Sequence, residues 1–312
     1  MHAYRLSSRK SLSQVPMVRV TLLAALASLG LLGATVPSAP GPSFWVVRRG
    51  ESRVFILGFG EARDTSWLTP TIREAFEASS HVWLETRRSS DPDLDPSALR
   101  AAAERMEKLG RESGRTLFDA LEPSARTRTY AYLAELGIDP DSVKTLRPWR
   151  VYYTIAGGFW RRQRLGYEPV SVEAALEAMA ARSGKFLGYE FPTREAFVNL
   201  MAGMSDRAQS QYLEWLFDFF DDYKKGLYDE AEMFGWVQGN RLPFRSLDLM
   251  RAKPDLYQVM QPQRNLWWAR KIDELLKTPG TYFVAVGQLH VMGPDGIPRQ
   301  LERLGITIEA LP

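Results

Sequence analysis

Three apolar segments of the chain each lead directly into a side chain that can do chemistry. Glu61 and His290 each lie three residues after the glycine that ends a segment, and Glu85 follows the third segment at once. A segment without polar residues is typical of a strand buried on both faces, and a terminal glycine allows a sharp exit. Because such sheets place ligands beyond the carboxyl ends of their strands, we expect these side chains along one edge. The segments are Val54–Gly58, Val82–Leu84 and Tyr282–Gly287.

One imidazole and two carboxylates form a donor set that suits a divalent cation such as Mn, Fe, Co or Zn. Such a cation can activate a water molecule for hydrolysis. His290, Glu61 and Glu85 are therefore the candidate metal ligands, and the two glutamates are also candidate catalytic residues. The spacing by itself equally allows an ordinary interpretation, in which the glutamates are surface carboxylates and the histidine is a satisfied loop residue.

The chain has only three histidines, so a second imidazole ligand could come only from the other two. His2 lies in the N-terminal leader. His81 lies at the start of the expected third strand, four residues before Glu85, and we expect it to be structural. His290 is then the only imidazole left for a metal site.

The strands that must position these residues follow from the hydrophobic pattern. Two β-like runs separated by the polar segment 48–53 predict a hairpin at the start of the body. Apolar segments near the C-terminus predict that the chain returns to the same sheet. The expected strands are Phe44–Val47, Val54–Phe59, Val82–Glu85, Lys185–Glu190, Thr281–Val286 and Ile306–Ala310.

Between these strands the chain is mostly helical, because apolar residues recur there at spacings of three and four. The expected helices are Thr69–Ser79, Ser97–Leu109, Pro123–Leu136, Pro148–Arg164, Val172–Arg182, Asp206–Lys225, Asp229–Gln238, Gln263–Leu276 and Gly296–Leu304. The fold class is α+β or α/β: a mixed central sheet built from N- and C-terminal strands, with a large helical insertion. We expect the first and last segments to lie side by side.

Two groups of charged residues have competing interpretations. Asp218, Asp221 and Asp222 accompany an apolar helix stripe, which predicts that they form its solvated face. Arg264 lies near the start of the last long helix and is a candidate catalytic residue, as an electrophilic or anion-binding group. It is equally compatible with an ordinary surface arginine.

The N-terminal residues 1–39 have the layout of an export signal. They contain four basic residues and no acidic one, then the apolar run Leu22–Ala34 and a Pro-rich stretch. The run is shorter than the roughly 20 apolar residues of a membrane-spanning helix, which favours a signal peptide over an uncleaved anchor. Under both alternatives the body from residue 40 to residue 312 is exported, and we expect it to be periplasmic or secreted. Membrane contact would come only through the N-terminal segment.

Composition excludes several kinds of protein. The chain has no cysteine, so it has no disulfide scaffold, zinc knuckle, iron–sulfur cluster or thiol nucleophile. The formal charge of +3 comes from the leader, which holds four of the 40 basic residues and none of the 37 acidic ones. The body is therefore close to neutral and carries no nucleic-acid-binding motif, which disfavours DNA or RNA as a partner.

The C-terminal segment FVAVGQLHVMGPDG and the residues after it resemble the signature of the TraB/GumN family, which includes the Tiki-type metal-dependent proteases. That family pairs two Gly-x-x-His motifs with a glutamate after an early strand. The second motif corresponds to Gly287–His290, and the glutamate corresponds to Glu85. Weaker similarities follow in family order at Pro148-Trp149, Glu190, Trp236 with Gly239, and Arg264-Asn265 followed by Trp268. The resemblance covers about residues 44–311, so residues 40–312 are expected to form one domain of this family.

The first motif of this chain departs from the family pattern. Where histidine is expected, the sequence has Gly58-Phe59-Gly60-Glu61. A glutamate can ligate a metal and shifts the site toward harder oxygen chemistry. The alternative is a degenerate site that binds metal poorly or not at all.

Two functions from different classes follow. The resemblance implies an exported, divalent-metal-dependent hydrolase that acts on peptide bonds of a peptide or protein substrate. In it His290 with Glu61 or Glu85 holds the cation, and the remaining carboxylate acts as general base. The alternative is a non-catalytic exported binding protein that keeps the fold and the cleft. Glu61 discriminates between them, because only the enzyme needs it to face a site shared with His290.

Overall fold

The computed structural model describes residues 41–312 except 88–95, 113, 164–169, 229–232 and 240–242. All of these residues belong to one compact unit, Ser38–Pro312. The expected leader, the end of the helix predicted to reach Arg164 and the start of the helix predicted from Asp229 lie outside the described residues.

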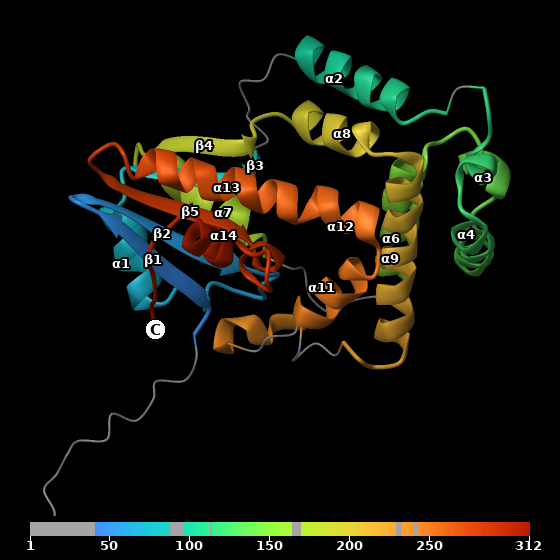
Figure 1. Ribbon diagram of the computed structural model, residues 1–312. Helices are drawn as coiled ribbons and strands as arrows, with labels where there is room; N and C mark the ends of the chain where they lie inside the picture. Colours follow the sequence, from blue (N-terminus) through green and yellow to red (C-terminus); the bar gives the residue numbers. More distant parts are fainter. Residues whose placement is uncertain (1–40, 88–95, 113, 164–169, 229–232, 240–242) are drawn as a thin grey trace, which may run out of the picture. The chain divides into compact units, whose positions relative to one another are not determined.

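A six-stranded mixed sheet is the scaffold, with strand order β4-β3-β5-β2-β1-β6 (Figure 1). Strands β4, β3, β5 and β2 run parallel to one another, whereas β1 is antiparallel to both of its neighbours. The four parallel strands therefore end at one edge. The strands are β1 Ser43–Arg49, β2 Ser52–Phe59, β3 His81–Thr86, β4 Phe186–Phe191, β5 Thr281–Gly287 and β6 Ile308–Ala310.

The predicted fold class is confirmed. β5, from the end of the chain, lies between β2 and β3 from its beginning, and β6 pairs with β1. The N- and C-terminal strands thus share one sheet, as the two similar apolar segments predict. The register brings Phe59 opposite Gly287, so the strands before Glu61 and His290 end side by side.

Strand alternation divides the residues of β2 between two cores. Phe55 and Leu57 pack with helices α1 (Pro70–Ala78) and α7 (Val172–Arg182) on one face. Val54 and Ile56 pack on the other face with α13 (Pro262–Leu275) and α14 (Ile297–Arg303). Because helices cover both faces of the sheet, the sequence of β2 is a run of apolar residues and does not alternate between apolar and polar ones.

The helical insertion has a core of its own. Helix α6 (Pro148–Gln163) packs against α9 (Asp206–Lys224) and α4 (Pro123–Leu136). At its centre the rings of Phe159 and Phe220 stack with centroids 3.7 Å apart. The remaining helices are α2 Pro96–Leu109, α3 Leu117–Ala120, α5 Pro140–Val143, α8 Arg194–Gly203, α11 Pro243–Arg251 and α12 Pro254–Met260. Helices α12 and α13 connect this insertion with the sheet (Figure 1).

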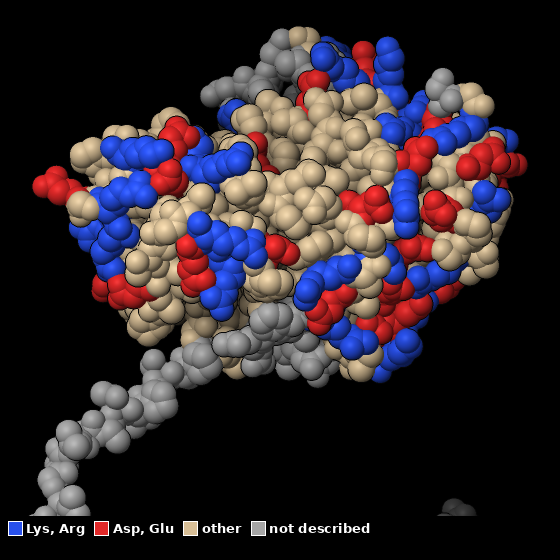
Figure 2. All heavy atoms as spheres, in the orientation of Figure 1, with Lys and Arg blue, Asp and Glu red and all other residues tan. Residues whose placement is uncertain are grey.

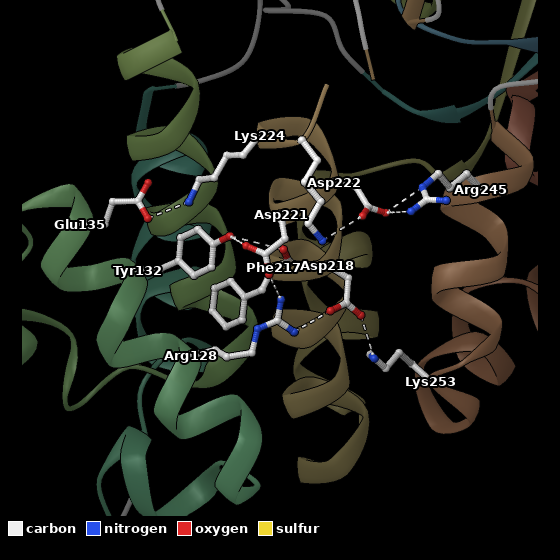
Figure 3. Close-up of polar contacts among 11 residues, drawn as sticks. Arg128, Tyr132, Glu135, Phe217, Asp218, Asp221, Asp222, Lys224, Arg245 and Lys253 are labelled. Carbon is white, nitrogen blue, oxygen red and sulfur yellow. Dashed lines mark hydrogen bonds and ion pairs between the residues drawn. The ribbon is translucent and has the colours of Figure 1, made fainter. Parts of the chain in front are cut away.

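The aspartates of α9 are not a purely solvated face, and that prediction is wrong. Figure 3 shows them paired with cations from neighbouring helices. Asp218 and Asp221 accept from Arg128 of α4 at 2.6 and 2.8 Å, and the buried Asp222 accepts from Arg245 of α11 at 2.7 Å. An amphipathic pattern identifies the apolar stripe of a helix but not the helices that lie beside its polar face.

Some helices differ from the expected pattern. Helices α8, α11 and α12, and the short α3 and α5, were not predicted. Where a helix was expected to reach Gln238, the described residues form a 3-10 helix, η1 (Gly235–Gln238), which Gly239 ends in the left-handed conformation with φ 81°. None of the helices in the described part of the chain is long and apolar enough to cross a membrane. On the face drawn in Figure 2, basic and acidic side chains are interspersed around an uncharged centre.

Candidate functional site

The candidate site lies beyond the carboxyl ends of the parallel strands. Glu85 is the penultimate residue of β3, and His290 lies in the 3-10 helix η2 (Gln288–Val291) that follows β5 directly. Their side chains converge, with His290 Nε2 3.6 Å from Glu85 Oε2. Arg264, near the start of α13, reaches the same carboxylate at 2.6 Å. The structure therefore brings three of the four predicted site residues into direct proximity.

Glu85 is held as a carboxylate. Burial by itself would raise its pKa, but the charges of His290 and Arg264 and a hydrogen bond from the Gly287 backbone N–H outweigh burial and hold the pKa well below its usual range. Oε1 accepts from the Gly287 N–H, and Oε2 accepts from Arg264. A Cβ at Gly287 would lie 3.0 Å from Oε1, so the glycine permits this approach. Glu85 is consequently ionised at neutral pH.

Arg264 is a buried cation rather than a surface arginine. Only 7% of it is exposed, and its guanidinium lies over the Phe191 ring. Its Nε and Nη2 form a bidentate pair with Glu190, and each donates at 2.7 Å. The same Nη2 also donates to Glu85. Burial would lower the pKa of Arg264, but Glu85 and Glu190 outweigh it and raise the pKa further. Arg264 therefore fixes the position of Glu85 and bridges β3, β4 and α13.

His290 is oriented by a chain of hydrogen bonds. Asn265 Nδ2 donates to the Asp295 carbonyl at 2.8 Å, so Asn265 Oδ1 is the atom that faces His290 Nδ1, at 2.6 Å. An acceptor there places a proton on Nδ1 and leaves Nε2 as the free nitrogen of the neutral ring. Nε2 is the atom that faces Glu85. Histidines that bind metals are held through their second nitrogen in this way.

Glu61 lies two residues after β2 and lines the same cavity. Its backbone carbonyl accepts from the Trp236 indole, and Gly60 lies against that ring, because a Cβ there would come within 2.9 Å of it. The side chain is exposed, yet the cavity walls desolvate it in part and raise its pKa above the ordinary value. Glu61 has no ion pair within the described residues. Glu61 and His290 thus line the same cavity, but they form no three-donor group among the described residues.

The four side chains border one cavity of about 490 Å³. Glu61, Glu85, Arg264 and His290 lie at its sheet end, and aromatic side chains of α6 and α9 form much of its opposite wall. A second cavity of about 620 Å³ shares Glu85 and Arg264 with the first. The charged cluster therefore lies where two cavities meet.

The donors fit a divalent cation only in part. Two ligands of one tetrahedral cation, each about 2.1 Å from it, lie about 3.4 Å apart, close to the 3.6 Å between His290 Nε2 and Glu85 Oε2. No group of three or more His, Asp or Glu side chains placed to hold an ion occurs among the described residues. His290 and Glu85 thus suit two positions of a metal site, and a third ligand requires Glu61 to turn toward them.

His81 lies at the opposite edge of the sheet, at the start of β3. Its Nδ1 is 2.8 Å from Ser80 Oγ, and its ring packs against Phe186 and Tyr282 with centroids 5.1 and 5.2 Å away. It is far along the strand from Glu85 and makes a matched control for His290.

Glu190 and Asn265 also belong to the site, although neither is among the candidate residues that the sequence suggests. Glu190 ends the apolar run of β4 just as Glu85 ends that of β3, so the same signal marks it. No pattern near Asn265 in the sequence marks it. It orients His290 only because folding brings α13 next to η2.

The fold and this arrangement define a class: a mixed-sheet scaffold with a carboxylate–histidine–arginine cluster at the ends of its parallel strands. The sequence model of the TraB/PrgY/gumN family matches residues 43–310, which is nearly the whole described chain. The chain belongs to the TraB/PrgY/gumN family. No curated protein and no solved structure matches the chain.

Proposed function

We propose that the chain is a divalent-metal-dependent hydrolase that cleaves peptide bonds. The observation that carries the proposal is the convergence of His290 Nε2 and Glu85 Oε2 at 3.6 Å, beside a cavity that Glu61 also lines. The hydrogen bond from His290 to Asn265 supports it, because it directs the free nitrogen to Glu85.

The charge of the cluster also supports a divalent cation. Glu61, Glu85 and Glu190 are three carboxylates, and the guanidinium of Arg264 pairs with Glu85 and Glu190. Metal binding requires the neutral form of His290, and in that form the three carboxylates and Arg264 together carry two negative charges. A divalent cation is the counter-charge that balances them.

Each residue has a distinct role in this proposal. His290 and Glu85 hold the cation, which when bound supplies the acidity that ionises a water at neutral pH. Arg264 keeps Glu85 ionised and in place. Glu61, whose pKa is raised by partial burial, is the third ligand or the general base that accepts the proton.

The substrate class and the location belong to the proposal as well. A peptide or protein substrate is what the resemblance to the TraB/GumN family, which includes the Tiki-type metal-dependent proteases, implies. Residues 1–39, with their basic start and apolar run, support export to the periplasm or secretion, as a cleaved signal or an uncleaved anchor.

A second candidate is a non-catalytic exported binding protein. One observation favours it: both oxygens of Glu85 already have partners, in Arg264 and Gly287, and the described residues contain no complete three-donor group. In that case the charged cluster is structural and the cavity alone is functional.

Hydrolysis of fluorescein-labelled casein tests the two candidates. The purified chain is stripped with a chelator and then supplied with Mn²⁺, Co²⁺ or Zn²⁺. The enzyme proposal expects activity that returns with metal in the wild type and in His81→Ala, but not in His290→Ala. Activity that survives both the chelator and His290→Ala contradicts the proposal, and metal binding without hydrolysis of any peptide bond favours the binding protein.

A further inference from the structure

The parallel part of the sheet divides at its carboxyl end, between β3 and β5. β3 pairs with β5 as far as Trp83 and Val284. From there β5 stays beside β2 as far as Gly287, whereas β3 stays beside β4 as far as Thr86. The two cavities meet at this split, because Gly287 lines one, Thr86 lines the other and Glu85 lines both. Such a crevice at the strand ends is where open α/β sheets place their ligands.

The backbone N–H of Thr86 points into this split, where a side chain accepts it instead of a strand. The next N–H along β3, that of Arg87, donates to the Phe191 carbonyl of β4. Successive N–H groups of a strand point to opposite sides, so the N–H of Thr86 points away from β4. This is the side on which β5 has left the ladder, and the acceptor there is Glu173 of α7.

Glu173 is a buried carboxylate with both oxygens directed at Thr86. Its Oε1 accepts from the backbone N–H at 2.7 Å, and its Oε2 accepts from Oγ1 at 2.9 Å. The residue is 2% exposed, and a carboxylate at that depth is costly unless hydrogen bonds satisfy it. It lies in the first turn of α7, whose Val172 and Leu176 belong to the core against the sheet. The packed helix therefore holds the carboxylate against the end of β3.

These hydrogen bonds act on the site through one peptide plane. The N–H of Thr86 and the carbonyl of Glu85 belong to the same planar peptide unit. Fixing the direction of that N–H fixes the plane that begins at Glu85 Cα, and with it the direction of the Glu85 side chain. That side chain crosses the split, accepts from the Gly287 N–H and lies 3.6 Å from His290 Nε2.

We propose that Glu173 is a positioning residue, whose two hydrogen bonds to Thr86 direct Glu85 across the split toward Gly287 and His290. It acts through Glu85 and deepens the proposed hydrolase, in which Glu85 is a candidate metal ligand. Its effect on metal binding rests on that proposed function. Its effect on the placement of Glu85 needs no metal, so the two are measured separately.

The amide proton of Gly287 reports the placement of Glu85 directly. A hydrogen bond to a carboxylate is charge-assisted and strong, and it moves the resonance of the amide proton downfield. Val286-Gly287 is the only Val-Gly pair in the sequence. Labelling valine with ¹³C at the carbonyl and glycine with ¹⁵N therefore isolates this one amide in the spectrum of the metal-free chain.

The variants separate the hydrogen bonds from the charge and from general stability. Glu173→Ala removes both acceptors. Glu173→Gln keeps both hydrogen bonds without the charge, because its amide oxygen accepts from the Thr86 N–H and its NH₂ donates to the hydroxyl. Glu177→Ala is the matched control: Glu177 lies one turn later on α7, is 6% exposed and accepts from Tyr189 of β4 at 2.6 Å.

We expect the Gly287 resonance far downfield in the wild type, Glu173→Gln and Glu177→Ala, and upfield, among ordinary backbone amides, in Glu173→Ala. Both alanine variants should lower the melting temperature by about 2–12 °C, so lost stability alone does not explain the difference. If Glu173→Ala does not fold, Glu173→Asp, which withdraws the carboxylate by one methylene group, should shift the resonance in the same direction.

An unchanged Gly287 resonance in the folded Glu173 variants overturns the inference. An equal upfield shift in Glu177→Ala or in Glu173→Gln also overturns it, because the hydrogen bonds to Thr86 would then not be the cause. With Zn²⁺, Glu173→Ala should bind about 10- to 100-fold more weakly than Glu177→Ala. A wild type that binds no metal contradicts the proposed hydrolase and leaves the result for the amide proton standing.

Discussion

Replacing Glu190 by glutamine should destabilise the fold strongly although it changes only one atom. The Glu190 side chain is 6% exposed and accepts hydrogen bonds from Arg264 Nε, Arg264 Nη2 and Trp268 Nε1, at 2.7, 2.7 and 2.9 Å. In Glu190→Gln, an amide NH₂ replaces one of the accepting oxygens and faces a donor. Arg264 then keeps only one of its two buried carboxylate partners.

The magnitude follows from burial. Removing one partner of a buried, hydrogen-bonded ion pair costs about 3–5 kcal/mol. For a domain of this size, each kcal/mol lowers the melting temperature by about 2–4 °C. We therefore expect Glu190→Gln to melt about 6–20 °C below the wild type. The effect should be largest where β4 meets α13, because Glu190 connects these elements.

Thermal unfolding followed by circular dichroism, with urea titration of tryptophan fluorescence, measures this effect. Glu309→Gln is the control, because Glu309 pairs with Arg48 on the surface and both side chains are more than half exposed. A surface pair of this kind is worth about 0–1 kcal/mol. Equal stability of Glu190→Gln and Glu309→Gln would show that the Glu85–Arg264–Glu190 cluster does not hold the strand ends together.

Three further predictions concern other parts of the molecule. Gly58→Ala places a Cβ 2.3 Å from a methyl group of Val291, so it should cost about 1–3 kcal/mol in urea unfolding and shift η2. Burial raises the pKa of the Glu61 carboxyl in the folded protein above its ordinary value of 4.5. The contribution of Glu61 to the free energy of unfolding is therefore fully present below pH 4.5 and is lost as the pH rises through the pKa of the folded state. Melting curves of metal-free protein should therefore show Glu61→Gln gaining stability relative to wild type as pH rises across that window, and a constant difference would contradict this. Asp222→Asn should destabilise by about 1–2 kcal/mol in urea unfolding, less than a fully buried pair, because its partner Arg245 is half exposed.

The sheet and two of the site residues could be predicted because their signals are local. The apolar runs of β2, β3 and β5 identify strands buried on both faces, and strand direction then brings Glu85 and His290 to one edge. This reasoning needs only the periodicity of side chains and the rule that parallel strands end together.

The remainder of the site depends on long-range packing. Arg264 was equally compatible with a surface position, because nothing near it in the sequence indicates that Glu190, 74 residues away, lies within hydrogen-bond distance. Asn265 presents the same difficulty, because its partner His290 lies 25 residues away. The α9 aspartates were misassigned because their partners come from helices distant in sequence, such as Arg128, 90 residues before Asp218.

Metal analysis tests the proposed site, in which His290 and Glu85, with Glu61, hold a divalent cation. The purified chain is equilibrated with Mn²⁺, Co²⁺ or Zn²⁺, dialysed and measured by atomic emission. We expect one ion per chain in the wild type and in His81→Ala, none in His290→Ala, and weakened binding in Glu61→Gln. A wild type that holds no stoichiometric metal under any supply, beside a Glu61→His variant that does, would show that these residues do not form a metal site.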